Sequence, residues 1–162
     1  MALSTPVADA PDLESIGQGL VSVARLLSQG RIFEQILRQA KVDVGRADVA
    51  LLHSLSAAGD CVRLGDLADR LGVDAPTVTR RVQQLEGRQL LGRASDPRDK
   101  RACLVHLTPA GQRIITRVLL ARQRWLEGVL GTWSKRDREE LGRLLTRFVD
   151  DVGTDLEGHD GH

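Results

Sequence analysis

The chain has 162 residues, of which 41% are hydrophobic and 28% are charged, and its net charge is only +1. This balance is typical of one ordinary globular domain with or without helical extensions, and it argues against a disordered chain. No apolar run approaches the roughly 20 residues needed to cross a bilayer, and no signal sequence is recognised, so we expect a cytoplasmic protein without membrane contact.

The core must be built almost entirely from aliphatic side chains. The aromatic residues are Phe33, Trp125, Trp133 and Phe148, and there is no tyrosine. Strands draw on aromatic and β-branched residues, so a core of Leu, Val, Ile and Ala favours helices over a large sheet. The composition therefore predicts a mainly α fold with at most a small β hairpin.

The N-terminal part is predicted as a disordered arm over residues 1–11, followed by a long helix over 12–45. Asp12 can cap this helix, and apolar residues then recur at three- and four-residue steps as far as Ala40. Gly30 interrupts the stripe and permits a kink there. A domain this small cannot bury so long a stripe alone, which predicts dimerisation through this helix.

Residues 46–107 are predicted to form a compact domain of short elements. The expected order is a helix over 46–58, a strand over 61–63, helices over 65–71 and 75–90, and strands over 90–95 and 102–107. The first helix stops at Gly59, a plausible C-cap. The polar run 96–101 joins the last two strands into a hairpin with a charged tip.

Residues 108–152 are predicted as two further helices that take part in dimerisation. The first opens at Thr108-Pro109 and runs for about 20 residues with an apolar stripe. The second starts at Ser134, with Asp137 three residues on in a variant of the capping box. We expect residues 153–162 to be a flexible tail.

The helices over 65–71 and 75–90 have the spacing of a helix-turn-helix. Two helices that cross steeply need a small side chain at their contact, and Ala68 supplies it. The turn needs a residue that tolerates a left-handed backbone, which Gly72 does, and Asp74 can cap the second helix. An ordinary helical hairpin has the same spacing, so this pattern alone does not establish DNA binding.

The outer face of the second helix favours DNA binding. At 100° per residue Val78, Val82 and Leu85 point to one side, and the other side and its flanks carry hydroxyl, amide and guanidinium groups without a carboxylate before Glu86. Arg and Gln can read base edges in the major groove, and Thr can bond to phosphate or contact a thymine methyl group. The candidate DNA-binding residues here are Thr77, Thr79, Arg80, Gln83 and Gln84.

Positive charge is concentrated in the same region. Residues 77–106 contain seven cationic and three anionic side chains, although the whole chain is close to neutral. The hairpin tip contributes Arg98, Lys100 and Arg101, and a narrow hairpin can enter the minor groove, whose negative potential attracts arginine. Asp96 and Asp99 would repel phosphate, so we interpret them as braces that hold the tip through ion pairs.

The sequence resembles the MarR family of winged helix-turn-helix transcription regulators. The similar segments are the wing and following helix start (Asp96 to Gly111), together with Leu67 to Val73 and Thr77 to Arg80. The resemblance places Thr79 and Arg80 at the recognition helix and Arg98 and Arg101 at the wing. Arg81 occupies a position that is commonly apolar in the family; a phosphate contact and a pairing with an acidic neighbour both stay open for it.

The resemblance implies a homodimer in which the first helix and the last two helices interlock, with a winged domain on each side. Such a dimer would bind a palindromic operator in double-stranded DNA, with half-sites about one helical turn apart. It further implies a repressor that is released by a small aromatic or phenolic effector.

Three alternative functions have less support in the sequence. Catalysis is disfavoured because the sequence has no phosphate-binding glycine loop, metal-ligand spacing or nucleophile–base pair, so we expect no enzyme, metal or cofactor. A helical interaction module that does not bind DNA would leave the concentrated cations unexplained. A thiol-based, oxidation-sensing repressor could use Cys61 and Cys103, which fall in strands that pair in winged domains; we favour two inert thiols.

Overall fold

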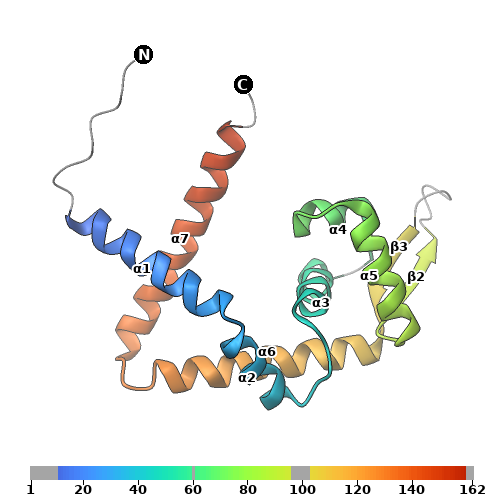
Figure 1. Cartoon of the computed structure of the whole chain (residues 1–162), viewed down its shortest axis with the longest axis horizontal. Coiled ribbons are helices and arrows are strands. Elements are labelled where there is room, and N and C mark those ends of the chain that lie inside the picture. The colour runs from blue at the N-terminus through green and yellow to red at the C-terminus, as the bar shows by residue number, and fades with distance from the viewer. Residues whose placement is uncertain (1–10, 60, 96–102, 160–162) are drawn as a thin grey trace. The chain divides into compact units, whose positions relative to one another are not determined.

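The computed structural model describes residues 11–59, 61–95 and 103–159 of the chain, which forms two compact units, residues 1–122 and residues 123–162. Helices predominate in both units, and the first unit also holds a small antiparallel sheet (Figure 1). The prediction of a mainly α fold with a small β hairpin is therefore confirmed. Within the described ranges, no helix is long and apolar enough to cross a bilayer.

The single helix predicted over 12–45 is wrong in one respect, because the chain forms two helices there. Helix α1 spans Pro11–Ser28 and helix α2 spans Arg31–Ala40. Gly30 lies between them in the left-handed region (φ 76°), a conformation that breaks the helix instead of kinking it. Residues 41–45 then lead into α3 without regular structure.

The helix-turn-helix prediction is confirmed in its local details. Helix α3 spans Arg46–Ala58, α4 spans Leu64–Leu71 and α5 spans Ala75–Gly87. Gly72 has the expected left-handed backbone (φ 62°), and its N–H and that of the next residue bond to carbonyls of the last turn of α4. Ala68, the small residue expected at the contact of the two helices, is buried.

Helix α5 ends at Gly87, three residues before the predicted end. Gln89 adopts a left-handed backbone (φ 59°), and the Leu90 N–H bonds to the carbonyl of Leu85 at 2.9 Å. The Gln89 N–H bonds to the carbonyl of Glu86 at 2.8 Å, which completes a Schellman cap. A non-glycine residue in this position gave no helix-stop signal in the sequence.

The three strands form one antiparallel sheet in the order β1-β3-β2. Strand β1 is Val62–Arg63, β2 is Leu91–Ser95 and β3 is Cys103–Leu107. The pairing of β2 with β3 confirms the hairpin on which the wing was predicted.

The core of the first unit lies where α3, α4 and α5 meet the sheet and the start of α6 (Pro109–Val129). Its fully buried side chains are aliphatic, as the composition predicts: Leu51, Leu52, Leu55, Leu67, Val78, Val82, Leu85, Val105 and Ile115. At 25 cal/mol per Å² of apolar surface, each such side chain contributes about 1.5–3 kcal/mol to stability. This core holds α5 with one face inward and the other in solvent.

Helix α6 begins in close contact with the end of the α5 segment. The Thr108 hydroxyl donates to the carbonyl of Gln89 (2.7 Å) and accepts from the N–H of Gly111 (3.1 Å). Gly111 lies so near the main chain that a Cβ added to it would sit 2.1 Å from the carbonyl oxygen of Leu90. The absence of a side chain at Gly111 therefore sets how closely α6 approaches the sheet.

Helix α7 spans Lys135–His159 and is capped as predicted. The N–H of Asp137 bonds to the Ser134 hydroxyl at 3.1 Å, and that hydroxyl donates to the Asp137 carboxylate at 2.7 Å. The predicted tail over 153–162 is wrong as far as residue 159, because the helix continues through Gly153. Leu156 continues the apolar spacing, and an interior glycine costs a helix only about 1 kcal/mol.

Candidate nucleic-acid interface

The start of helix α5 is held by its cap residue. The Asp74 carboxylate accepts the main-chain N–H of Thr77 and the Thr77 hydroxyl, each at 2.8 Å. These two hydrogen bonds lower the pKa of Asp74 below its ordinary value of 3.8, and the bond from the N–H has the larger effect. The positive charge of Arg80 lowers this pKa further. The cap therefore fixes the direction in which the first turn of α5 leaves the turn of the motif.

This lowered pKa predicts a dependence of stability on pH. Because the pKa is depressed in the folded state, the ionised cap stabilises the fold fully above the unfolded value of 3.8, and this contribution is lost as the pH falls through the lower folded value. Thermal unfolding of the wild type and of Asp74→Asn, measured between about pH 6 and pH 2.5, should show the wild-type advantage shrinking below pH 3.8. A difference that is the same at every pH would contradict the assignment.

The outer face of α5 presents most of the predicted DNA-binding side chains to solvent. Thr77, Arg80, Gln83 and Gln84 are exposed, and Thr79 is half-buried. A polar hollow of about 540 Å³ runs along the helix and is lined by Asp74, Pro76, Thr77, Arg80, Arg81 and Gln84. The structure thus brings Thr77, Arg80 and Gln84 together around one hollow.

The two threonines use their hydroxyl hydrogens within the protein. Thr77 donates to Asp74, and Thr79 donates to the main-chain carbonyl of Ala75 at 2.8 Å. In this arrangement neither hydroxyl donates to a phosphate, so the contacts left to these residues are through the methyl groups and the oxygen lone pairs. Among the predicted residues of α5, Arg80, Gln83 and Gln84 are exposed and carry donor groups, the guanidinium and the two amides.

The last turn of α5 is joined to the wing strands by an ion pair. Glu86, which is the first carboxylate of this helix, lies 2.7 Å from the Nε of Arg93 on β2. The pair neutralises the carboxylate that would repel a phosphate. It also ties the recognition helix to the base of the hairpin.

The predicted wing residues Asp96, Arg98, Asp99, Lys100 and Arg101 lie outside the described residues. Strands β2 and β3 bracket them, with Ser95 paired to Cys103 at the outer end of the hairpin. Their roles as cationic contacts and as braces stay predictions.

Cys61 and Cys103 lie at different levels of the sheet. Val62 pairs with Val105, so the register places Cys61 level with His106, three residues along β3 from Cys103. At a rise of about 3.3 Å per residue this offset is about 10 Å, whereas the Cα atoms of a disulfide lie within about 7 Å. A disulfide between them would require the sheet to rearrange, which favours the interpretation as two separate thiols.

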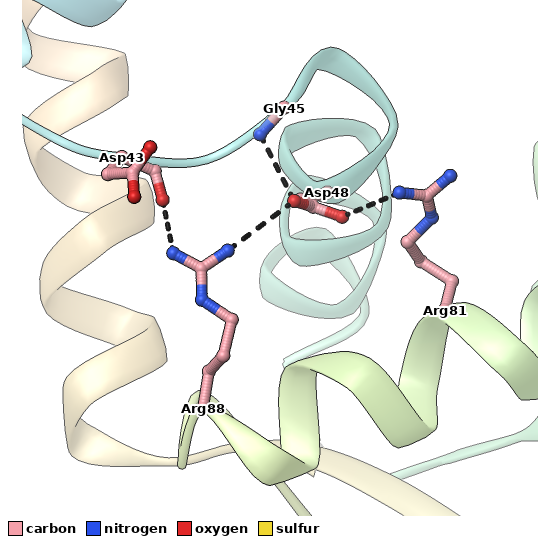
Figure 2. A network of polar contacts seen from close by, with 5 residues as sticks. All are labelled: Asp43, Gly45, Asp48, Arg81 and Arg88. Carbon is pink, nitrogen blue, oxygen red and sulfur yellow. Dashed lines mark hydrogen bonds and ion pairs between the residues drawn. The ribbon is translucent and has the colours of Figure 1, made fainter.

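One residue of this region was missed by the sequence analysis. Asp48, on α3, is a buried acidic residue, and its carboxylate lies 3.2 Å from the Nη1 of Arg81 (Figure 2). Of the two interpretations left open for Arg81, the structure shows the pairing with an acidic neighbour. The sequence contained a signal for this ion pair. Asp48 lies on the apolar face of its helix with Leu51 and Leu55, and Arg81 lies on the apolar face of its helix with Val78.

Two helices across a tight turn, followed by a β hairpin that joins a short preceding strand in one sheet, define a winged helix-turn-helix protein. The profile of the MarR family matches residues 46–103. The HTH-type transcriptional regulator YxaD of Bacillus subtilis is 32% identical over 103 residues, which are 64% of this chain and 71% of that protein. The chain belongs to the MarR family of DNA-binding transcriptional regulators.

Solved structures show the same fold over most of the chain. A MarR family protein from Bacillus stearothermophilus superposes with a TM-score of 0.78 at 23% identity, covering 91% of this chain and 99% of that one. A variant of MepR from S. aureus, bound to an oligodeoxyribonucleotide, superposes with a TM-score of 0.58 at 20% identity, covering 82% of this chain and 97% of that one.

Proposed function

We propose that this protein is a repressor that binds a palindromic operator as a homodimer and is released by a small aromatic or phenolic effector. The observation that carries the proposal is the outer face of α5, where exposed donors line a polar hollow without an unpaired carboxylate. A solvated helix face ordinarily mixes both signs of charge. Here the nearest carboxylates, Asp74 and Glu86, are engaged by the helix cap and by Arg93.

Exposed apolar surface supports the homodimer. On α1 and on α7, large apolar side chains at helical spacing are more than two-fifths exposed, among them Leu13, Ile16, Leu20, Val23 and Leu27 on α1 and Leu144, Leu145, Phe148, Val149, Val152 and Leu156 on α7. Monomeric proteins rarely leave contiguous apolar faces of this kind in water. A second copy, with the same faces, would cover them symmetrically.

The structure of the MepR variant with an oligodeoxyribonucleotide supports the use of this fold on DNA. We place α5 in the major groove and the wing cations, Arg98, Lys100 and Arg101, at the minor groove and the phosphates. The effector part of the proposal is supported by membership of the MarR family.

The experiment that tests the proposal is a mobility shift on the DNA that flanks the gene of this protein. The wild type is expected to bind one site with an inverted repeat, and candidate phenolic ligands are expected to release it. Random DNA of the same length gives the specificity ratio, measured at a stated salt concentration. Failure to prefer the flanking DNA over random DNA would overturn the proposed function.

Arg80→Ala is expected to separate base reading from phosphate binding. If Arg80 reads a base edge, its loss costs about 1–3 kcal/mol on the operator and much less on random DNA. Arg98→Ala provides the contrast, because loss of a phosphate contact weakens binding to both DNAs and lowers the salt slope by about 1. An equal loss on both DNAs in Arg80→Ala would show that this residue only holds phosphate.

A further inference from the structure

The inner side of helix α5 carries a polar cluster that DNA contact does not explain. We call it the Asp48 cluster: the side chains of Asp48, Arg81 and Arg88 with the main chain of Asp43 and Gly45 (Figure 2). The Oδ1 of Asp48 accepts from the Arg81 Nη1 at 3.2 Å, and its Oδ2 accepts from the Gly45 N–H at 3.0 Å and lies 3.7 Å from the Arg88 Nη1. The Nη2 of Arg88 also donates to the carbonyl of Asp43.

The cluster joins three segments that are distant in the sequence. Asp48 lies in the first turn of α3, the two arginines lie on α5 and at its C-cap, and Asp43 and Gly45 lie in the connection between α2 and α3. Arg81 and Arg88 are seven residues apart, so they face the same side of the helix at points about 10 Å apart along its axis. The inner side of α5 is thus held at two points by one carboxylate.

The burial of Asp48 makes these contacts matter. Asp48 is 8% exposed, and a carboxylate taken out of water is costly unless cations and hydrogen-bond donors compensate it. Apolar residues of similar size could give the same stability. Hydrogen bonds differ from apolar contacts in being directional, so they permit fewer orientations of α5 on the core than Val78, Val82 and Leu85 would alone.

Arg80 and Arg81 are adjacent and both line the polar hollow, but their side chains differ in what holds them. Arg80 is exposed, whereas the Arg81 side chain is 37% exposed and is held by Asp48. A rotation of α5 about its axis would move both residues together. The contact that holds Arg81 therefore also sets the direction in which Arg80 points.

We propose that Asp48 is a positioning residue that fixes the rotation of the recognition helix through Arg81 and Arg88, and that Arg81 serves this contact in place of a phosphate contact. The inference rests on the proposed DNA binding. Because Arg88 also holds the carbonyl of Asp43, the cluster makes the orientation of α5 depend on the connection that leads from α2.

Asp48→Asn tests this proposal because positioning and simple electrostatics predict opposite results. Removing a negative charge from a DNA-binding protein should tighten its binding to all DNA, if charge alone matters. Positioning predicts instead that operator affinity falls about tenfold or more, as for coupled contacts, while binding to random duplex is unchanged or tighter. Asp66→Asn, an exposed carboxylate on α4, makes the same charge change outside the cluster and should not lower operator affinity.

Arg81→Met tests the second half of the proposal. A phosphate contact at Arg81 would lower the slope of log K against log salt by about 0.9, whereas a positioning role leaves the slope at its wild-type value and lowers only the ratio of operator to random binding. Methionine can fill the space of the arginine stem, and Arg88 and the Gly45 N–H still face the carboxylate of Asp48 in this variant. A slope lowered by about 0.9, with the ratio of operator to random binding unchanged, would overturn the positioning role of Arg81.

Amide hydrogen exchange tests the cluster without DNA. Asp48→Asn should exchange faster than the wild type at residues 41–45 and 85–90, and Asp66→Asn should not. If the wild type prefers its operator but Asp48→Asn and Asp66→Asn are alike in both binding and exchange, the positioning role is wrong. If the wild type binds no DNA specifically, the proposed function fails, and the exchange comparison alone decides whether the cluster holds α5.

Discussion

Phe148→Asp is expected to convert the proposed dimer into monomers and to abolish operator binding at concentrations where the wild type binds. Phe148 is 42% exposed on α7, beside Leu144, Leu145 and Val152. In a symmetric dimer the change occurs twice, and each lost apolar contact costs about 1.5–3 kcal/mol before the burial of a charge is added. The dimer dissociation constant should therefore rise by at least a few hundredfold, since 1.4 kcal/mol is a factor of ten.

The loss of DNA binding follows from the loss of the dimer. Two linked winged domains bind two half-sites with a high effective concentration, and a monomer loses that advantage without losing any base contact. Sedimentation velocity measures the assembly and a mobility shift measures the binding. Thr146→Asp, which adds the same charge on a different side of α7, should leave both as in the wild type. A Phe148→Asp protein that still sediments as a dimer would rule out α7 as the dimer interface.

Gly111→Ala is expected to destabilise the first unit by about 3 kcal/mol or more, at or above the upper end of the 1–3 kcal/mol typical of overpacking. The added Cβ would lie 2.1 Å from the carbonyl oxygen of Leu90 and 3.2 Å from the Leu107 side chain. A carbonyl of the main chain cannot turn aside as a flexible side chain can. Helix α6 would have to move away from Leu90 and the start of β2, at the expense of the Thr108 hydrogen bonds.

Helix propensity predicts the opposite effect of Gly111→Ala on stability. Alanine is better than glycine inside a helix by about 1 kcal/mol, so propensity alone predicts that the variant is more stable. Gly65→Ala on α4 is a suitable control, because nothing lies within 4 Å of its added Cβ, and it should be neutral or slightly stabilising. Chemical denaturation of both variants and the wild type gives the free energies of unfolding. A Gly111→Ala protein as stable as the wild type would refute the close approach of α6.

The local motifs of the fold could be predicted from the sequence because the interactions behind them span only a few residues. Asp74 caps α5 through Thr77, Ser134 caps α7 through Asp137, and Gly72 ends α4 with a left-handed backbone. Each feature depends on hydrogen bonds between residues at most three or four apart. The outer face of α5 was predictable for a similar reason, because the helical period alone places Arg80 opposite Val78 and Val82.

Features that depend on non-local contacts were harder to predict. The backbone of Gln89 ends α5 early in a conformation that non-glycine residues seldom adopt, and Gly30, where the sequence indicated at most a kink, separates two helices. Helix α7 runs past Gly153 because its other residues sustain the helix. For Gln89 and Gly153 the local preference is worth only about 1 kcal/mol, which the rest of the fold or of the helix readily overrides.

The sequence by itself determined that this protein has a helix-turn-helix with a cationic outer face and resembles the MarR family. Only the tertiary structure decided what Arg81 does. Its partner Asp48 lies 33 residues away in the chain, and the pairing depends on how the stripes of α3 and α5 meet. Helical periodicity states which side chains share a face, but the element that covers that face is set by packing across the core. For this reason the sequence indicated which residues form the exposed face of α5, and the structure identified the contact between Asp48 and Arg81 behind it.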